Sequence, residues 1–150
     1  MRTTAKADYA VRAAVELAAA GDLVTAEQVA DAQGIPLNFL ENILRDLRRA
    51  GVVDSRRGQQ GGYTLARPAG EISVADVIRA VEGPLATVRG QAPEDLAYAG
   101  SAERLGEVWV ALRAAVRSVL EQVTLADLAR GPLPASVEQL THDADAWVRR

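Results

Sequence analysis

The sequence contains no cysteine among its 150 residues. Disulfides, thiolate nucleophiles, cysteine-based zinc sites and thiolate-held iron–sulfur clusters are therefore all excluded. Histidine is almost absent as well, because His142 is the only one. A metal site needs more good ligands than His142, Asp143 and Asp145, so we interpret His142 as a surface residue and expect no metal and no other cofactor.

Long apolar runs are also missing. No stretch reaches the roughly 18 uninterrupted apolar residues of a membrane-spanning helix. The N-terminus, MRTTAKADYAV, lacks the apolar core of a signal peptide. We therefore expect no membrane partner and a cytoplasmic location.

The residue groupings typical of enzymes are not found either. There is no serine beside a histidine, no carboxylate cluster, and no glycine-rich loop in front of a helix that would hold a phosphate. The glycines at positions 58, 61 and 62 lie between two expected strands, which is the wrong context for a nucleotide site. We predict that the protein is not an enzyme.

The chain is 49% apolar but only 4% aromatic, so its core must consist of Ala, Val, Leu and Ile. This composition favours helices, and the length fits one domain or one small domain with a dimerisation element. The net charge of −3 argues at first against nucleic acid. Between positions 36 and 69, however, six arginines face three acidic residues, so this segment is locally basic. Binding depends on the charge of one face more than on the total.

Three helices are predicted in the first third of the chain, over residues 5–20, 25–32 and 36–50. The second begins with the capping-box pattern of Thr25 to Gln28, and Gly34 supplies the stop before the third. Two helices joined by a short turn containing glycine form a helix-turn-helix.

A basic hairpin is predicted next. Short β-type runs at 52–55 and 63–66 enclose a segment with three glycines and two arginines, which is the pattern of a wing. Ser73 is expected to cap a helix that Gly83 and Pro84 end. The fold class is therefore mainly α with a small β-wing, a winged helix-turn-helix over residues 1–83.

The second half is predicted to contain a loop over 84–100, then a long helix capped by Ser101 and a short helix from Thr124, together spanning 101–131, and a tail over 132–150 that is helical in part. Apolar residues spaced by four and three along the long helix form a heptad seam for dimerisation. The seam residues are Leu105, Trp109, Leu112, Val116, Val119 and Val123. We interpret Trp109 and Trp147 as core or interface residues rather than ligand-stacking residues.

The polar face of the third helix is the main candidate for DNA contact. Asn38, Asn42 and Arg45 share that face, where Asn can pair with adenine, Arg with guanine, and Glu41 with a cytosine amine. In the wing, glycines permit close approach to phosphates and an arginine fits a narrow minor groove. Each feature alone is also compatible with an ordinary solvated surface. The full set of predicted DNA-binding residues is Asn38, Glu41, Asn42, Arg45, Arg49, Arg56, Arg57, Gln59 and Tyr63.

Residues 1 to about 130 resemble the Rrf2 family of bacterial repressors. The stretches that carry the resemblance are AKADYAVRA, IPLNFLENILRDLRRAGVVDSRRGQQGGYTLARP, VADVIRAVEGP and VTLADL. The resemblance implies base contacts from Asn38, Glu41 and Asn42, an arginine at Arg57 in the minor groove, and dimerisation through the helix near 101–123. A two-fold dimer would bind a pseudo-palindromic operator.

The chain departs from the family at one point. Many members hold an iron–sulfur cluster through three cysteines in the loop before the long helix, and this chain has none. Asp8 matches a position from which some members supply a carboxylate ligand to the partner's cluster. Without thiolates beside it, we interpret Asp8 as a structural charge at a helix start.

Two functions remain open from the sequence. The first is a DNA-binding repressor that responds to an unknown effector, either a small molecule beside the 84–100 loop or a protein. The second is a winged-helix protein-interaction module that has lost DNA binding, which the net acidity and the acids Glu41 and Asp46 on the third helix support.

Overall fold

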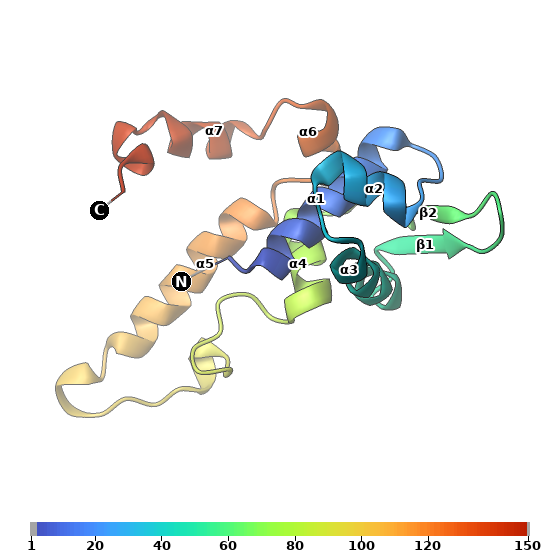
Figure 1. The fold of residues 1–150 in the computed structure, drawn as a ribbon. Helices are drawn as coiled ribbons and strands as arrows, with labels where there is room; N and C mark the ends of the chain where they lie inside the picture. The colour runs from blue at the N-terminus through green and yellow to red at the C-terminus, as the bar shows by residue number, and fades with distance from the viewer. Residues whose placement is uncertain (1–2, 150) are drawn as a thin grey trace.

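A computed structural model describes residues 3–149 of the chain (Figure 1). The N-terminal part contains α1 (Ala5–Ala20), α2 (Ala26–Gln33), α3 (Leu37–Arg49), β1 (Val53–Arg56), β2 (Gly62–Leu65), the 3-10 turn η1 (Ala69–Glu71) and α4 (Val74–Glu82). The second part contains η2 (Pro93–Asp95), η3 (Gly100–Ala102), α5 (Leu105–Leu120), α6 (Leu125–Arg130), α7 (Ala135–His142) and η4 (Ala144–Trp147). The mainly helical fold with a small β-wing is confirmed.

The helices of the first part begin and end at the local signals that the sequence predicted. Thr25 and Ser73 each form a complete capping box, at α2 and α4. Gly21 and Gly34 adopt left-handed backbone conformations at the ends of α1 and α2, where a residue with a Cβ is disfavoured. The turn between α2 and α3 is therefore short, as the helix-turn-helix prediction requires.

The core forms where α1, α2, α3 and α4 meet the start of the hairpin and α6. Its largest fully buried side chains include Leu17, Val29, Leu40, Ile43, Leu44, Leu47, Val53, Ile72, Val77 and Leu125. The buried face of α1 consists of alanines in addition to Leu17. Because alanine is small, the neighbouring helices can approach α1 closely, and α1 contacts α2, α3, α4 and α6.

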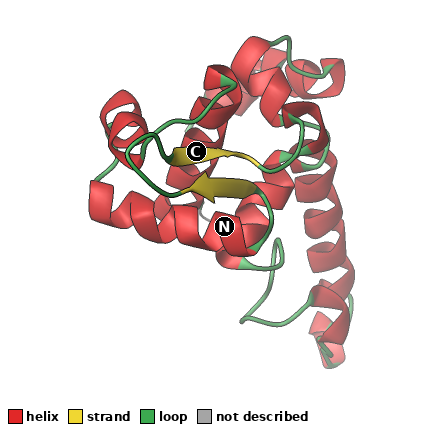
Figure 2. Ribbon diagram, turned by 90° about the vertical axis from the view of Figure 1, so that its right-hand side faces the viewer, coloured by secondary structure: helices red, strands yellow, loops and turns green. Residues whose placement is uncertain are grey.

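The hairpin is antiparallel, with Val53 opposite Leu65 and Arg56 opposite Gly62. Each strand starts or ends within one residue of the predicted position. Val24, just before α2, pairs with Tyr63 through two backbone hydrogen bonds and anchors the hairpin to the domain. Gly62 is required there, because a Cβ would lie 2.8 Å from the carbonyl oxygen of Val24. Figure 2 shows the hairpin among the helices, with α5 extending away.

Two boundaries of the long helix were predicted wrongly. Residues 100–102 form the 3-10 turn η3, and α5 begins after Arg104, so Ser101 does not cap it. The helix ends at Leu120, and Val123 lies beyond it, buried in the chain's own core. There the carbonyl of Val123 accepts a hydrogen bond from the amide of Val74 at 2.9 Å.

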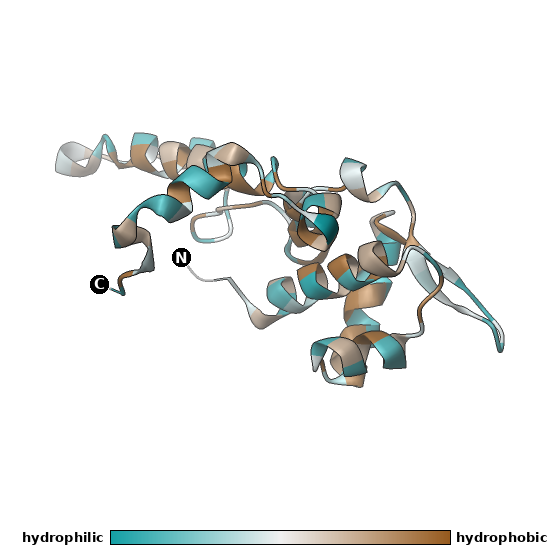
Figure 3. Ribbon diagram, turned by 90° about the horizontal axis from the view of Figure 1, so that it is seen from above, coloured by the Kyte–Doolittle hydropathy of each residue, from teal (hydrophilic) through white to brown (hydrophobic). Residues whose placement is uncertain are grey.

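The remaining predictions for the second half agree with the structure in outline. The 84–100 segment is a loop, interrupted by the single turn η2 and a bridge between Val88 and Gln91. Thr124 forms a capping box at the start of α6, and the tail contains α7 and η4. Figure 3 shows α5 and the tail leaving the domain on the same side, with apolar residues along both.

None of the helices between residues 3 and 149 combines the length and apolar character that crossing a bilayer requires.

The ammonium group of Lys6 links three helices, namely α1, α3 and α4. Lys6 on α1 lies 2.8 Å from the carboxylate of Asp46 on α3, and it donates a hydrogen bond of 2.9 Å to the carbonyl of Val81 at the end of α4. The hydrogen bond from Lys6 lowers the pKa of Asp46 below its ordinary value, and Arg49 adds to the effect from 3.7 Å. The ion pair thus fixes α3 against the two helices behind it.

We expect Lys6→Met to raise the pKa of Asp46 and to reduce the free energy of unfolding by about 1 kcal/mol at neutral pH. Because the folded pKa of Asp46 is lowered, the charge contribution is complete above about pH 4 and is lost as pH falls through the lowered pKa. The free energy of unfolding, measured with urea at a fixed protein concentration, should therefore differ less between wild type and Lys6→Met in acid than at neutral pH.

The matched control is Arg104→Met. Arg104 and its ion-pair partner Glu107 have side chains 87% and 71% exposed, so this substitution should change the free energy of unfolding little at any pH. If Lys6→Met lowers the free energy of unfolding by the same amount at pH 7 and in acid, the assigned ion pair is contradicted.

Candidate nucleic-acid interface

The polar face of α3 is open to solvent. Opposite the buried stripe, every residue predicted to contact DNA from this helix is exposed, namely Asn38, Glu41, Asn42, Arg45 and Arg49. The stripe itself is at most 1% exposed, so the helix cannot rotate without burying polar groups. The structure thus presents a helix whose orientation is fixed and whose outer face is free to enter a groove.

Two of these side chains and one backbone carbonyl form a hydrogen-bonded chain along the helix. The amide nitrogen of Asn42 donates to the backbone carbonyl of Asn38 at 3.1 Å, and Arg45 donates to the side-chain oxygen of Asn42 at 2.9 Å. Asn42 therefore holds the guanidinium of Arg45 in position. An amide beside a guanidinium on one helix face has the donors and acceptors that read base edges.

An open hollow separates α3 from the wing. Glu41, Arg45, Arg48 and Tyr63 line it. Arg48 also donates a hydrogen bond of 3.0 Å to the hydroxyl of Ser55 on β1, which links the helix to the hairpin. Sequence reasoning counted Arg48 in the basic segment but not as a site residue. Tyr63 is half-buried against the core, so only part of this predicted site residue is accessible.

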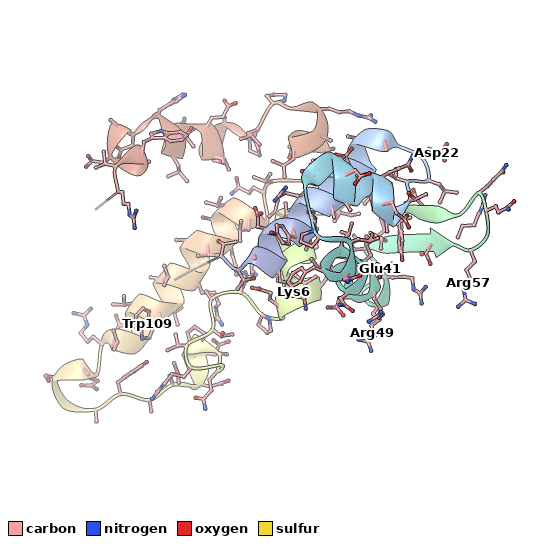
Figure 4. The ribbon with its side chains drawn as sticks, viewed as in Figure 1. Lys6, Asp22, Glu41, Arg49, Arg57 and Trp109 are labelled. Atoms are coloured by element: carbon pink, nitrogen blue, oxygen red, sulfur yellow. The ribbon has the colours of Figure 1, made fainter. Side chains whose placement is uncertain are left out.

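The predicted wing residues are all exposed. Arg56 ends β1, and Arg57 and Gln59 lie in the loop of the hairpin. Within residues 3–149, neither Arg56 nor Arg57 has a carboxylate within ion-pair distance. In Figure 4, Arg57 and Arg49 project toward the same lower side of the view. The two elements thus offer positive charge to one common surface.

Phe39 is a residue of this surface that sequence reasoning missed. It lies at the start of α3, is 44% exposed, and packs edge-to-face on Tyr9 with ring centroids 5.7 Å apart. The guanidinium of Arg12 covers the Tyr9 ring at 5.3 Å, which completes a small stack between α1 and α3. The sequence signal that could have identified Phe39 is an aromatic residue on a helix face whose other residues are polar.

The charges of this surface favour an anion. Glu41 is the one exposed acid on α3, whereas Asp46 is neutralised by Lys6 and Arg49. The arginines at positions 45, 48, 49, 56 and 57 are all exposed. Opposite charge within a Debye length attracts a polyanion irrespective of more distant acids.

The residues of the predicted seam lie mostly on α5, but the structure gives their face another neighbour. Leu105, Trp109, Leu112, Val116 and Val119 are half-buried. Trp109 donates a hydrogen bond of 3.0 Å to the hydroxyl of Tyr98, and Val116 lines a pocket with Leu85, so the 84–100 segment covers part of this face. The exposed apolar residues of the helix are Val108 and Val110, at 55% and 41%, which the heptad pattern did not single out.

The residues of this chain do not fit a thiolate-held cluster. No cysteine is present, and within residues 3–149 no group of three His, Asp or Glu side chains is arranged to hold a metal ion. Asp8 lies in the first turn of α1 and forms an ion pair of 3.2 Å with Arg12. Carboxylates are poor ligands for cluster iron, so we derive no step through a cluster.

Comparison with known proteins identifies close relatives. Residues 3–131 match the model of the Rrf2 family, described as an iron-dependent transcriptional regulator. A Mycobacterium tuberculosis protein whose name describes an HTH-type transcriptional regulator is 55% identical over 145 residues, which cover 95% of this chain and 90% of that protein. The HTH-type transcriptional regulator CymR of Bacillus subtilis is 35% identical over 131 residues, covering 86% of this chain and 90% of CymR.

Solved structures agree with this relationship. CymR of B. subtilis, which its title calls the global cysteine regulator, matches with a TM-score of 0.72 and 33% identity, covering 86% of this chain and 96% of CymR. IscR of T. potens matches with a TM-score of 0.69 and 30% identity, covering 100% of this chain and 93% of IscR. These proteins are regulators and not enzymes at the level of the family. The chain is a DNA-binding, helix-turn-helix transcriptional regulator of the Rrf2 family.

Proposed function

We propose that the protein is a repressor that binds a pseudo-palindromic operator as a homodimer and reads its sequence with α3. The observation that carries this proposal is the exposed, hydrogen-bonded face of Asn38, Asn42 and Arg45 beside a wing whose arginines have no carboxylate partner in the described chain. A protein that had lost DNA binding would have no need for this unneutralised surface. The surface therefore favours DNA binding over the alternative of an interaction module.

The two elements of the surface have different tasks in this proposal. Asn38, Glu41 and Asn42 contact base edges in the major groove, where each base pair shows a distinct pattern of donors and acceptors. Arg57 enters the adjacent minor groove, and Arg56 and Gln59 contact the backbone. Arg45 and Arg49 extend the contact along the helix, and the accessible edge of Tyr63 lies between the two elements.

Dimerisation is proposed through α5. The helix has 16 residues, more than half of them apolar, and not one of them is buried in the single chain. An apolar helix that its own chain covers only in part needs a partner, and a second copy is the simplest one. Two copies related by two-fold symmetry would place two α3 helices on successive turns of DNA and so exclude other proteins from the operator.

The effector site is proposed at the pocket between α4, α5 and the 84–100 segment. Its volume is about 300 Å³, and its lining includes the apolar residues Ile78, Leu85, Val116 and Leu120. A pocket with both apolar and polar lining at the base of α5 suits a small molecule, and the exposed loop beside it suits a partner protein. Either effector would replace the cluster for which this chain has no thiolate ligands.

We expect Asn42→Ala to weaken operator binding by about 1–3 kcal/mol and to relax specificity at one base pair in each half-site. The loss would combine the base contact of Asn42 with the release of Arg45. Arg57→Ala should instead weaken binding by more than about threefold and flatten the preference for narrow-groove sequence. Selection of bound DNA from a random pool, followed by fluorescence anisotropy, measures both effects.

Arg104→Ala is the control, because this arginine is also highly exposed but lies at the start of α5, far from the wing. Uniform loss on all sequences with Asn42→Ala would mean a phosphate contact instead of base reading. Wild-type binding weaker than about 10 μM to every DNA at moderate salt would support the interaction module.

We expect Val108→Glu to shift the protein from dimer to monomer, because it places a charge on an exposed apolar position of α5 without disturbing the core. Sedimentation equilibrium measures the change. Arg104→Glu, on the same helix end but at a polar position, should leave the dimer intact. If the Val108→Glu protein dimerises like wild type, the exposed face of α5 around Val108 is not part of the dimer interface.

A further inference from the structure

The hollow between α3 and the wing lies between the two elements that the proposed function assigns to DNA. Its volume is about 360 Å³, and it is lined by Glu41, Arg45 and Arg48 from α3 and by Tyr63 from β2. Arg45 and Arg48 are both exposed. Within residues 3–149, neither of them has a carboxylate within ion-pair distance, and Glu41 is the one acid on the wall of the hollow. The hollow therefore has an excess of positive charge.

Hydrogen bonds hold both arginines of the hollow in place. Arg48 donates a hydrogen bond of 3.0 Å to the hydroxyl of Ser55 on β1, and Arg45 donates one of 2.9 Å to the side chain of Asn42. Ser55 lies directly opposite Tyr63 in the hairpin, so the two side chains share one face of the sheet. The ring of Tyr63 packs against the core, which fixes the wall of the hollow on the side of the wing.

The guanidinium of Arg48 has donors to spare. A guanidinium carries more N–H groups than one hydrogen bond uses, and the partner of Arg48 is a neutral hydroxyl, which does not compensate the charge. Asp54, the acid next to Ser55, lies opposite Thr64 and so points to the other face of the hairpin. A guanidinium fixed in this way favours a phosphate or a carboxylate, because both accept charge-assisted hydrogen bonds from it.

The shape of duplex DNA indicates which of these anions reaches the hollow. The proposed function places α3 in a major groove and Arg57 in the adjacent minor groove. One sugar-phosphate strand separates two adjacent grooves of a duplex, so this strand has to pass between α3 and the wing. The hollow lies in that space, beside the contact of α3 with β1 (Figure 1). The anion that the geometry brings to Arg48 is therefore a backbone phosphate.

We propose that Arg48 binds one phosphate of the DNA strand that crosses this hollow, with Arg45 beside it. The inference rests on the proposed function and adds to it a residue that has no role there. A phosphate contact carries no sequence information, but it fixes the register of the protein on the duplex. Because Arg48 also bonds to Ser55, it holds the phosphate, α3 and the wing in one arrangement.

Arg48→Met tests the contact, because it keeps an aliphatic side chain and removes the charge. On an operator selected from a random pool, we expect severalfold weaker binding in fluorescence anisotropy, by the same factor for every single-base variant of the operator. The plot of log affinity against log salt concentration should lose about 0.9 of its slope for each half-site, and Arg48→Lys should restore it. Arg104→Met, the control at the exposed start of α5, should keep the wild-type slope.

Ser55→Ala distinguishes a phosphate contact from a purely structural link between α3 and the wing. It removes the hydroxyl that accepts the hydrogen bond from Arg48 and leaves the guanidinium in the protein. We expect Ser55→Ala to keep the wild-type salt slope. If Ser55→Ala weakens binding as much as Arg48→Met, and both flatten the preference for narrow-groove sequence, Arg48 acts only through the wing and the phosphate contact is overturned.

Neutral methylphosphonates, introduced into the operator one position at a time, locate the phosphate. We expect one position in each half-site, between the bases that α3 reads and the adjacent minor groove, to weaken the binding of wild type severalfold more than that of Arg48→Met. Equal losses for the two proteins at every position would overturn the phosphate contact and leave the proposed function intact. A wild-type protein that prefers no DNA sequence would instead overturn the proposed function.

Discussion

The rotation of α3 about its own axis decides which side chains can reach DNA. Leu40, Ile43, Leu44 and Leu47 fill the core on one side, and a turn of one residue position would move a polar side chain into their place. Burying an unpaired amide costs roughly 2–7 kcal/mol by transfer measurements, and burying an ionised carboxylate costs more, so the apolar stripe permits one orientation. The Lys6 and Asp46 pair holds the same orientation from outside the core.

Local charge explains how an acidic protein can present a surface for DNA. Fields between exposed charges decay over about 8–10 Å at physiological ionic strength. The arginines of α3 and the wing lie within one surface, whereas the acids of α7 and η4 lie at the far end of the molecule. Of the two acids on α3, Asp46 is already paired with Lys6 and Arg49, so only Glu41 opposes the arginines from this helix. The net charge of the chain therefore does not decide whether the protein can bind DNA.

Much of the fold was predictable because its signals are local. Helical period, capping residues and glycine stops are read within a few positions, and α1 to α4 and α6 lie within a few residues of their predictions. The ends of α5 were not predictable in this way. The heptad period continues to Val123, but the backbone there pairs with Ser73 and Val74, about fifty residues earlier, and this pairing ends the run. Such long-range pairing leaves no mark in a local pattern.

The same distinction between local sequence signals and long-range contacts applies to the candidate site. The shared face of Asn38, Asn42 and Arg45 follows from helical spacing alone, and in the structure Arg45 donates a hydrogen bond to the Asn42 side chain, which donates to the backbone carbonyl of Asn38. Lys6, Phe39 and Arg48 were missed because their roles come from neighbours on other elements. A heptad pattern likewise shows that α5 has an apolar side, but not whether the chain's own loop or a partner covers it.

The contacts of α5 suggest how a signal would reach the DNA. The 84–100 segment is held on one side by the Tyr98 to Trp109 hydrogen bond and by the ion pair of Glu94 with Arg113, in which Arg113 lowers the pKa of Glu94. Val108 and Val110 are 55% and 41% exposed, but they lie about 200° apart around the helix axis and so flank this covered side instead of forming a second one. In the proposed dimer, the partner would pack on the part of α5 that the loop leaves exposed, so a change in the contacts of the loop would change the surface offered to the partner. α4, which Lys6 joins to α3, contacts both α3 and α5, so a movement of α5 has a direct packing route to the helix that we propose reads DNA.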